Sequence, residues 1–241
     1  MRVAIAGDWH GDIWVGTRAL EDIRKLGVQR VLHLGDFGVG FYKRSLSPVL
    51  IDLDMEIWVT LGNHENYDLV RQLPVENGVA TLDDRILLLP RGHAWEDDGV
   101  RFLSLGGASS IDRSQRRPGW SWWADELITQ ADVETAITSS PSGTDILLTH
   151  EAPEIAGVVE GFPFGYWPLE DEKTSLSQRK LVEQVWQGTK PYRTFHGHHH
   201  KRYDREVGYG QWIHGLADNN DPKNNWVILD GKELEHGRDN P

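Results

Sequence analysis

The 241-residue chain has a formal net charge of −12, contains 39% hydrophobic and 26% charged residues, and has no cysteine. These totals fit a soluble globular protein, and the missing cysteine excludes disulfides, thiolate metal ligands and a cysteine nucleophile. The apolar start MRVAIAGD is too short for a signal peptide, and no apolar run reaches the roughly 18 residues of a membrane span. We therefore expect a cytoplasmic protein with no membrane partner.

The negative charge also limits the class of substrate. Contacts to the phosphates of a long nucleic acid need a basic surface, so long nucleic acids are poor candidates for a chain of net charge −12. A small anion still binds where the site itself carries positive charge, and bound metal ions supply such charge without appearing in the formal count.

The first sixty residues alternate between predicted strands and predicted helices. Short apolar runs predict strands, and apolar residues at helical spacing predict helices, in the order strand 2–6, helix 17–26, strand 29–34, helix 48–54 and strand 56–61. This βαβαβ order is typical of a mainly parallel sheet with helices outside it.

The remaining chain predicts further strands and two further helices. Residues 85–89 and 100–105 are predicted to be strands joined by a polar turn, and Ser121 is predicted to cap a helix that runs to residue 138. The other predicted elements are a strand at 145–148, a helix at 177–186, and strands at 192–196, 202–207, 211–214 and 225–229. Without repeats or a linker, we expect one domain over residues 1–241 with two sheets packed together.

Five of the apolar runs end in a polar cluster. The clusters are GDWHG at 7–11, GDFG at 35–38, GNHE at 62–65, THEAP at 149–153 and GHHH at 197–200. Ligands of open α/β sheets bind beyond the carboxyl ends of the strands. If these strands are neighbours, their ends bring together Asp8, His10, Asp36, Asn63, His150, His198 and His200.

This set of side chains has the chemistry of a metal site. Carboxylate and imidazole ligands suit Mn²⁺, Fe²⁺ or Zn²⁺, and seven ligands are too many for one ion but suit two ions that share a carboxylate. An extended chain would direct Asp8 and His10 to one face, and likewise His198 and His200. The glycine before four of the clusters would allow a tight turn.

The expected charge of such a site favours an anionic substrate. Two divalent ions, two aspartates and a bridging hydroxide leave a net charge of about +1. A phosphate-type anion is therefore attracted to the site although the protein as a whole is acidic.

In this order, the five clusters resemble the calcineurin-like metallophosphoesterase superfamily, whose pattern runs D-x-H, G-D, G-N-H-E/D, H and G-H-x-H. The resemblance covers residues 7–200. It implies an α/β sandwich of four layers, in which two packed mixed β-sheets are flanked by helices. It also implies a hydrolase of phosphoric esters that uses two divalent ions, with Mn²⁺ expected and Fe, Zn or Ni possible.

The resemblance implies a role for each residue of the clusters. One metal would be held by Asp8, His10 and His200, the other by Asn63, His150 and His198, with Asp36 bridging them. His64 would be the catalytic histidine that assists the leaving group. Glu65 is expected to support its loop, and His33, His196 and His199 are expected to be structural or supporting.

Two loops are candidates for contact with the substrate, near residues 106–123 and 153–175. In the first, GGASSIDRSQRRPGWSWW, we expect Arg113 and Arg116 to contact phosphate and Trp122 to stack on a base. The alternative is a solvated basic loop with packing tryptophans. The loop also resembles a subgroup of bacterial and phage metallophosphoesterases. In the second loop, residues 162–167 are a candidate second wall or a packed surface loop.

Three functions remain open from the sequence. The first is a phosphodiesterase on small substrates such as cyclic nucleotides. The second is a phosphomonoesterase on nucleotides, metabolites or phosphoproteins, although GDFGVGF lacks the arginine that follows this motif in the protein phosphatases that it resembles. The third, an interaction scaffold without catalysis, is disfavoured because every ligand position and His64 are present. The sequence predicts no oligomeric state.

Overall fold

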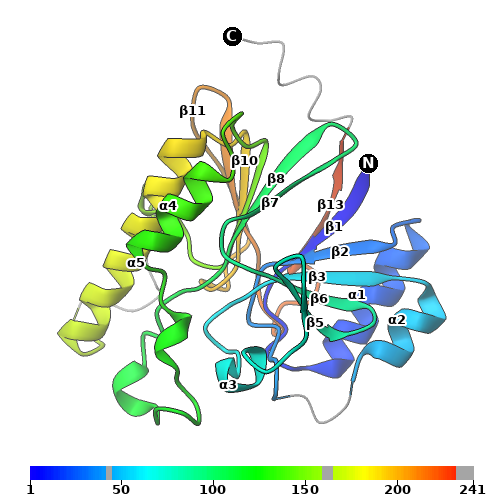
Figure 1. Cartoon of the computed structure of the whole chain (residues 1–241), viewed down its shortest axis with the longest axis horizontal. Helices are drawn as coiled ribbons and strands as arrows, with labels where there is room; N and C mark the ends of the chain where they lie inside the picture. The colour runs from blue at the N-terminus through cyan, green and yellow to red at the C-terminus, as the bar shows by residue number, and fades with distance from the viewer. Residues whose placement is uncertain (42–44, 159–164, 232–241) are drawn as a thin grey trace.

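Residues 1–41, 45–158 and 165–231 are described by the structure, a computed structural model. Two mixed β-sheets face each other, and helices cover the outer face of each, so that the chain forms four layers (Figure 1). The predicted sandwich of two packed sheets flanked by helices is thus confirmed.

The first sheet carries the βαβαβ unit. Its strands are β1 (Arg2–Ala6), β2 (Arg30–His33), β3 (Glu56–Thr60), β4 (Val75–Glu76), β5 (Val79–Asp83), β6 (Ile86–Leu89) and β13 (Trp226–Asp230). They lie in the order β13-β1-β2-β3-β6-β5-β4, with β1, β2, β3 and β6 parallel to one another. The helices α1 (Ile13–Lys25) and α2 (Ser47–Leu53) pack on its outer face, and the short α3 (Tyr67–Val70) follows β3.

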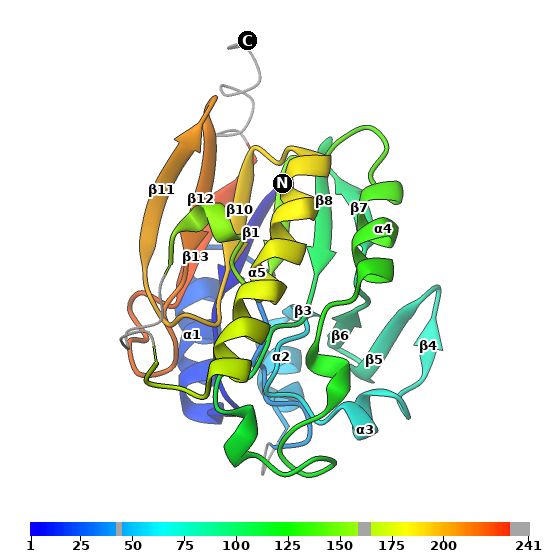
Figure 2. The same cartoon turned by 90° about the vertical axis from the view of Figure 1, so that its left-hand side faces the viewer.

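The second sheet is built by the later part of the chain. Its strands are β7 (His93–Asp97), β8 (Val100–Leu105), β9 (Ile146–Thr149), β10 (Arg193–His196), β11 (Tyr203–Gly208) and β12 (Gln211–Gly215), in the order β11-β12-β10-β9-β8-β7. The helices α4 (Gln130–Thr138) and α5 (Leu169–Thr189) cover it, as Figure 2 shows from the side. Short 3₁₀ turns are η1 (Arg113–Gln115), η2 (Ala124–Glu126) and η3 (Glu154–Ala156).

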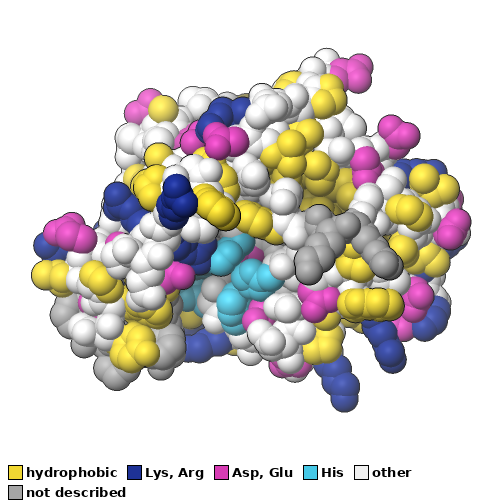
Figure 3. Space-filling view, turned by 90° about the horizontal axis from the view of Figure 1, so that it is seen from below, with side chains coloured by type: hydrophobic (Ala, Val, Ile, Leu, Met, Phe, Trp, Pro, Cys, Tyr) yellow, Lys and Arg dark blue, Asp and Glu magenta, His cyan; other side chains and the backbone are white. Residues whose placement is uncertain are grey.

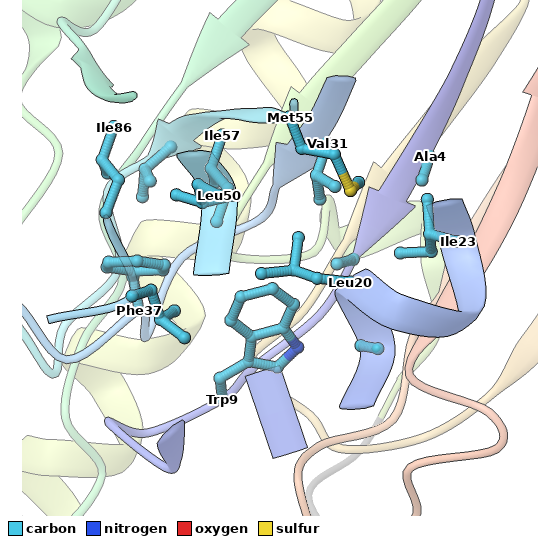
Figure 4. Packing of buried hydrophobic residues seen from close by; sticks show 14 of the residues in the cluster. Ala4, Trp9, Leu20, Ile23, Val31, Phe37, Leu50, Met55, Ile57 and Ile86 are labelled. Carbon is cyan, nitrogen blue, oxygen red and sulfur yellow. The ribbon is translucent and has the colours of Figure 1, made fainter. Parts of the chain in front are cut away.

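Three apolar clusters hold the four layers together. In β1, Ala4 and Ala6 face the cluster under α1 and α2, whereas Val3 and Ile5 face the cluster between the sheets. Trp9 fills the first cluster beside Phe37, Leu20 and Leu50 (Figure 4). A third cluster lies between the second sheet and α4 and α5. Because both faces of the central strands are buried, these strands are apolar without alternation, as parallel strands usually are.

The connection between residues 85–89 and 100–105 differs from the prediction. The two strands are β6 and β8, and they belong to different sheets. Residues 93–97 form β7, which pairs antiparallel with β8, and residues 75–83 add β4 and β5. Polar side chains in β7, which lies at the edge of its sheet, made it look like a turn in the sequence.

The predicted helix from Ser121 to residue 138 is also wrong at its start. Only α4 is α-helical, preceded by the 3₁₀ turn η2, and Thr129 caps α4 by exchanging hydrogen bonds with Asp132 in a capping box. Ahead of it, Leu127 is extended, and the carboxylate of Glu126 points to Ser110. The last helix, α5, begins eight residues earlier than the predicted residue 177. In the part of the chain that the structure describes, no helix is long and apolar enough to span a membrane, and a cytoplasmic location stays a prediction.

Candidate metal centre

The five polar clusters meet where the two sheets face each other. Three clusters follow β1, β2 and β3 in the first sheet, and two follow β9 and β10 in the second. The sequence suggested neighbouring parallel strands, whereas the structure brings the ends of strands from two sheets together. Figure 3 shows histidine side chains gathered in a hollow at this end of the molecule, with basic side chains beside them.

One group of ligand atoms comes from both sheets. Asp8, His10, Asp36 and His200 each offer an atom, and these atoms all lie within 4.8 Å of one another. The Nε2 atoms of His10 and His200 are 3.1 Å apart, and His200 Nε2 is 3.2 Å from Asp8 Oδ2. Carboxylate and imidazole atoms at this spacing can hold a metal ion.

A second group shares Asp36 with the first. Ligand atoms of Asp36, His150 and His198 lie within 4.8 Å of one another. His150 Nε2 is 3.1 Å from Asp36 Oδ1 and 2.9 Å from Asn63 Oδ1, so that the amide oxygen joins this group. The other oxygen, Asp36 Oδ2, is 3.6 Å from His10 Nδ1 in the first group. The Asp36 carboxylate therefore lies between the two groups.

The hydrogen bonds around these atoms fit a bound cation. His150 Nδ1 lies 2.8 Å from the carbonyl oxygen of Leu34, which accepts a hydrogen, so a neutral His150 ring turns the lone pair of Nε2 toward two oxygens. Asp8 Oδ1 is buried and has no hydrogen-bond partner among the described residues. Lone pairs that converge without a proton between them are stabilised by a positive ion.

The pKa shifts show that the carboxylates of this centre stabilise a nearby positive charge. Burial alone would lower the pKa of His150, but Asp36 and Asp8 raise it to about 10. Burial would raise the pKa of Asp36, yet the imidazoles of His150 and His64 hold it well below its usual range. The carboxylates thus attract whichever cation is available, a proton or a metal ion.

The backbone presents the ligands in a way that the sequence did not predict. His10, His198 and His200 have φ of 47°, 63° and 54°, so these segments are not extended, and the expected alternation of a strand does not orient them. The left-handed conformation costs roughly 1–2 kcal/mol per residue. His199 still points away from the metal groups, as expected, because its Nε2 lies 2.8 Å from Glu151 Oε1.

Two of the glycines before the clusters serve close approach rather than tight turns, whereas a third, Gly35, has the positive φ of 103° that the predicted tight turn requires. A Cβ atom added at Gly62 would clash with the backbone and carboxylate of Asp36, and one at Gly197 would clash with the carboxylate of Asp8. Neither residue has a positive φ. A side chain at either position would displace a carboxylate of the centre.

Three carboxylates support the centre from behind. Asp218 Oδ2 is 3.4 Å from His200 Nδ1, and Glu151 Oε2 is 3.6 Å from His198 Nε2. A carboxylate behind a ligand imidazole holds the ring in one orientation. Glu65 accepts hydrogen bonds from the backbone N–H groups of residues 37–39, which confirms its predicted role in supporting a loop. No sequence pattern pointed to Asp218, whereas Glu151 stands beside His150 in a polar cluster.

A pocket of about 350 Å³ opens beside the two metal groups. Its lining comprises His10, Gly38, Phe41, Asn63, His64, Asp112, Arg116, Ser121 and Trp123. Arg116 Nη2 is 2.9 Å from His64 Nε2, and Arg116 Nε donates to Asp112 Oδ1 at 2.6 Å. Burial and the charge of Arg116 lower the pKa of His64, against the opposing effect of Asp36. A neutral His64 and a guanidinium therefore face the space next to the metal groups.

The other two residues expected to contact substrate lie outside this lining. The indole N–H of Trp122 donates to Glu126 Oε1 at 2.8 Å, and the guanidinium carbon of Arg113 is 4.7 Å from the centre of the Trp122 ring. The neighbouring Trp123 lines the pocket instead. The proposed second wall at 162–167 lies partly outside the described residues, which resume at Gly165.

Comparison with known families gives one match over most of the chain. The model of the calcineurin-like phosphoesterase family matches residues 1–202. No curated protein sequence matches significantly.

Solved structures resemble the whole chain at low sequence identity. A dimetal phosphatase from Danio rerio has a TM-score of 0.56 at 12% identity, covering 95% of this chain and 91% of its own. TT1561 of Thermus thermophilus has a TM-score of 0.52 at 10% identity, and the match covers 95% of this chain and 98% of TT1561. GAP50, the anchor in the inner membrane complex of Plasmodium, has a TM-score of 0.50 at 13% sequence identity, and the match covers 91% of this chain and 72% of GAP50. At these identities the likeness shows a shared fold.

Proposed function

Because the chain belongs to the calcineurin-like phosphoesterase family, we propose that it hydrolyses small phosphodiesters, with cyclic nucleotides as the leading candidates. The family assignment makes the protein a hydrolase of phosphoric ester bonds. The proposal rests above all on one observation, the placement of the Asp36 carboxylate between two groups of metal-ligand atoms. The bacterial and phage subgroup stays a prediction.

We propose that each group of ligand atoms holds one divalent ion. Asp8, His10 and His200 would hold the first, Asn63, His150 and His198 the second, and Asp36 both. When bound, such ions would supply a water of lowered pKa and neutralise charge on the phosphate oxygens. Mn²⁺ is the ion to test first, and Fe, Zn and Ni suit the same ligands.

The charge of the pocket favours a diester over a monoester. Among the described residues that line the pocket, Arg116 is the only lysine or arginine, and Asp112 partly neutralises it. Arg113 and Arg117 instead lie over the rings of Trp122 and Trp120. A phosphodiester carries one negative charge and a monoester close to two at neutral pH. One guanidinium with its fork of donors suits the smaller charge.

We propose that His64 assists the leaving group. In the absence of a phosphate, burial and Arg116 keep His64 neutral by lowering its pKa. A phosphate anion beside the ring opposes both effects, so substrate binding raises the pKa and favours the protonated ring. A protonated His64 can then donate its proton to the departing alkoxide, which typically contributes roughly 10²–10⁴-fold to the rate.

The organic part of the ester meets an aromatic surface. The rings of Phe41 and Trp123 are 6.3 Å apart, and both line the pocket. Phe41 is 44% exposed, so its ring is open to a ligand, whereas Trp123 is 6% exposed. A nucleobase or another aromatic group can stack on such a surface, with the phosphate toward the metal groups. Small esters fit the 350 Å³ pocket, and we expect no binding of long nucleic acids.

The test compares diester with monoester. The metal-stripped protein is supplied with Mn²⁺ and assayed with bis(p-nitrophenyl) phosphate, p-nitrophenyl phosphate and the 2′,3′- and 3′,5′-cyclic nucleotides. We expect the diester to have the higher kcat/KM, and Asp36→Asn to abolish turnover. A higher kcat/KM for the monoester would replace the proposal with a phosphomonoesterase. No turnover with any of the four metals would favour an interaction scaffold.

A further inference from the structure

A line of buried hydrogen bonds runs from Asn63 away from the metal groups. Asn63 Nδ2 donates to Ser110 Oγ at 3.1 Å, and Ser110 Oγ donates to Glu126 Oε2 at 3.0 Å. The three residues are 3%, 1% and 0% exposed. Water therefore has little access to these bonds, and each donor depends on its protein partner.

The chemistry of the three groups sets the direction of this line. Burial raises the pKa of Glu126 to about 7, and above that pH its ionised carboxylate only accepts hydrogen bonds. A hydroxyl has a single hydrogen to donate. Once Ser110 donates to Glu126, its oxygen can only accept from Asn63. The amide NH₂ of Asn63 must then face Ser110, which leaves the amide oxygen facing His150 at 2.9 Å. The reversed amide would direct its NH₂ toward the metal groups.

Glu126 is itself held in place by several segments. Its Oε1 accepts from the backbone N–H of Ser110 and from the indole N–H of Trp122, both at 2.8 Å. Its carbonyl oxygen accepts from Ala108 N at 3.0 Å and from Arg91 Nη2 at 3.1 Å. Glu126 as a whole therefore cannot shift without breaking contacts to three parts of the chain, two of which touch its carboxylate.

We propose that Ser110 and Glu126 are positioning residues that hold the side-chain amide of Asn63 with its oxygen toward the second metal position. The proposal rests on the proposed function, since it requires an ion beside Asn63. It explains why a carboxylate is kept in a fully buried place, where its desolvation is unfavourable. It also gives Trp122 a role as a donor that anchors Glu126.

Two variants test this role, and the chain offers a matched control. Ser110→Ala removes the acceptor for the Asn63 NH₂. Glu126→Gln keeps the shape but places an NH₂ group against Ser110 Oγ, which would reverse the hydroxyl and with it the Asn63 amide. Ser109→Ala removes the hydroxyl of the adjacent buried serine, which has no hydrogen-bond partner among the described residues.

The measurement is the binding of Mn²⁺ to the metal-stripped protein by isothermal titration calorimetry, beside urea unfolding in EDTA. We expect Ser110→Ala and Glu126→Gln to weaken the second ion by about 10–100-fold, the size of effect typical of residues behind a ligand. The first ion should bind as in the wild type. Ser109→Ala should leave both affinities unchanged.

The outcomes separate this inference from the proposed function. If the wild type binds two ions and Ser110→Ala and Glu126→Gln bind the second as tightly as Ser109→Ala does, the positioning role is wrong. Equal weakening of both ions, together with lower stability in EDTA, would also overturn it and indicate a structural role alone. A wild type that binds fewer than two ions would instead overturn the proposed function.

Discussion

Asp36 and His150 lie 3.1 Å apart, from carboxylate Oδ1 to imidazole Nε2, although the strands before them belong to different sheets. Asp36 follows β2 and His150 follows β9. Their distance is determined by the apolar cluster between the sheets, which includes Leu32, Leu34 and Leu148 from the same segments. The candidate metal centre is therefore a product of sheet packing, and core and site should be energetically coupled.

Metal binding should stabilise the fold through Asp36. An ion that binds only the folded protein raises its free energy of unfolding by about 2.7 kcal/mol at a hundred times its Kd. We expect Mn²⁺ to raise the unfolding midpoint of the wild type in urea, and Asp36→Asn to lose most of this gain. Asp52→Asn, on an exposed position of α2, is the control and should respond as the wild type does. An undiminished gain in Asp36→Asn would exclude Asp36 as a ligand.

Arg116 should contribute to substrate binding. Arg116→Ala removes the guanidinium that lines the pocket, and a hydrogen bond to a charged group is worth about 1.5–3 kcal/mol. We expect KM for the diester to rise by about 10–100-fold, with a smaller rise for Arg116→Lys. Arg117, which lies over the exposed Trp120, offers the control, and Arg117→Ala should change KM less than about twofold. Equal effects of Arg116→Ala and Arg117→Ala would contradict a specific contact.

Gly62 should be intolerant of any side chain. A methyl group there would collide with Asp36 and come within 2.9 Å of His150 Nε2. We expect Gly62→Ala to lower the free energy of unfolding by roughly 1–3 kcal/mol and to weaken Mn²⁺ binding. Gly78→Ala is the matched control, because its φ of +84° makes alanine unfavourable while nothing lies within 4 Å. It should lose stability but keep its affinity for Mn²⁺, and similar affinities in both variants would contradict the prediction.

His33 should make the fold sensitive to acid. It is fully buried against Trp9 and Phe37, and burial lowers its pKa to about 3 from a usual value of 6.5. Between these values the unfolded chain binds one more proton than the folded chain, so stability falls as the pH drops below 6.5. The free energy of unfolding therefore falls by about 1.4 kcal/mol for each pH unit below 6.5, which is a loss of about 2 kcal/mol at pH 5.

The variant His33→Phe isolates this effect. Its ring keeps the apolar contacts but does not titrate. Urea unfolding in EDTA at pH 7.5 and 5.0 should show the variant gaining about 2 kcal/mol relative to the wild type at the lower pH. If the difference in free energy of unfolding between the variant and the wild type is the same at both pH values, His33 is not kept neutral by burial.

Much of the fold was predictable because the central strands are apolar on both sides and end in polar clusters. The strand at residues 2–6 has the predicted bounds, and the parallel order of β1, β2 and β3 followed from the helices between them. The edge strand β7 was missed, since its sequence HAWED has little apolar pattern of its own.

The site was predictable in its residue types and less so in its geometry. The sequence pattern named the residues that converge, but it could not show that two sheets supply them or that left-handed histidines present them. Glu126 follows an acidic residue where a helix was expected to begin, so its separate role as a partner of Ser110 was hidden. Asp218 lies in a loop without a motif, and only the folded chain places it against His200.

The most direct test of the central claim is to count the metal ions that activity requires. Metal-stripped protein would be titrated with Mn²⁺, and bound metal and hydrolysis of bis(p-nitrophenyl) phosphate would be measured at each step. Two ions per chain, with activity that rises mainly with the second, is the result that the two groups of ligand atoms around Asp36 predict. Full activity with one ion per chain, or in the stripped protein, would contradict a dinuclear centre.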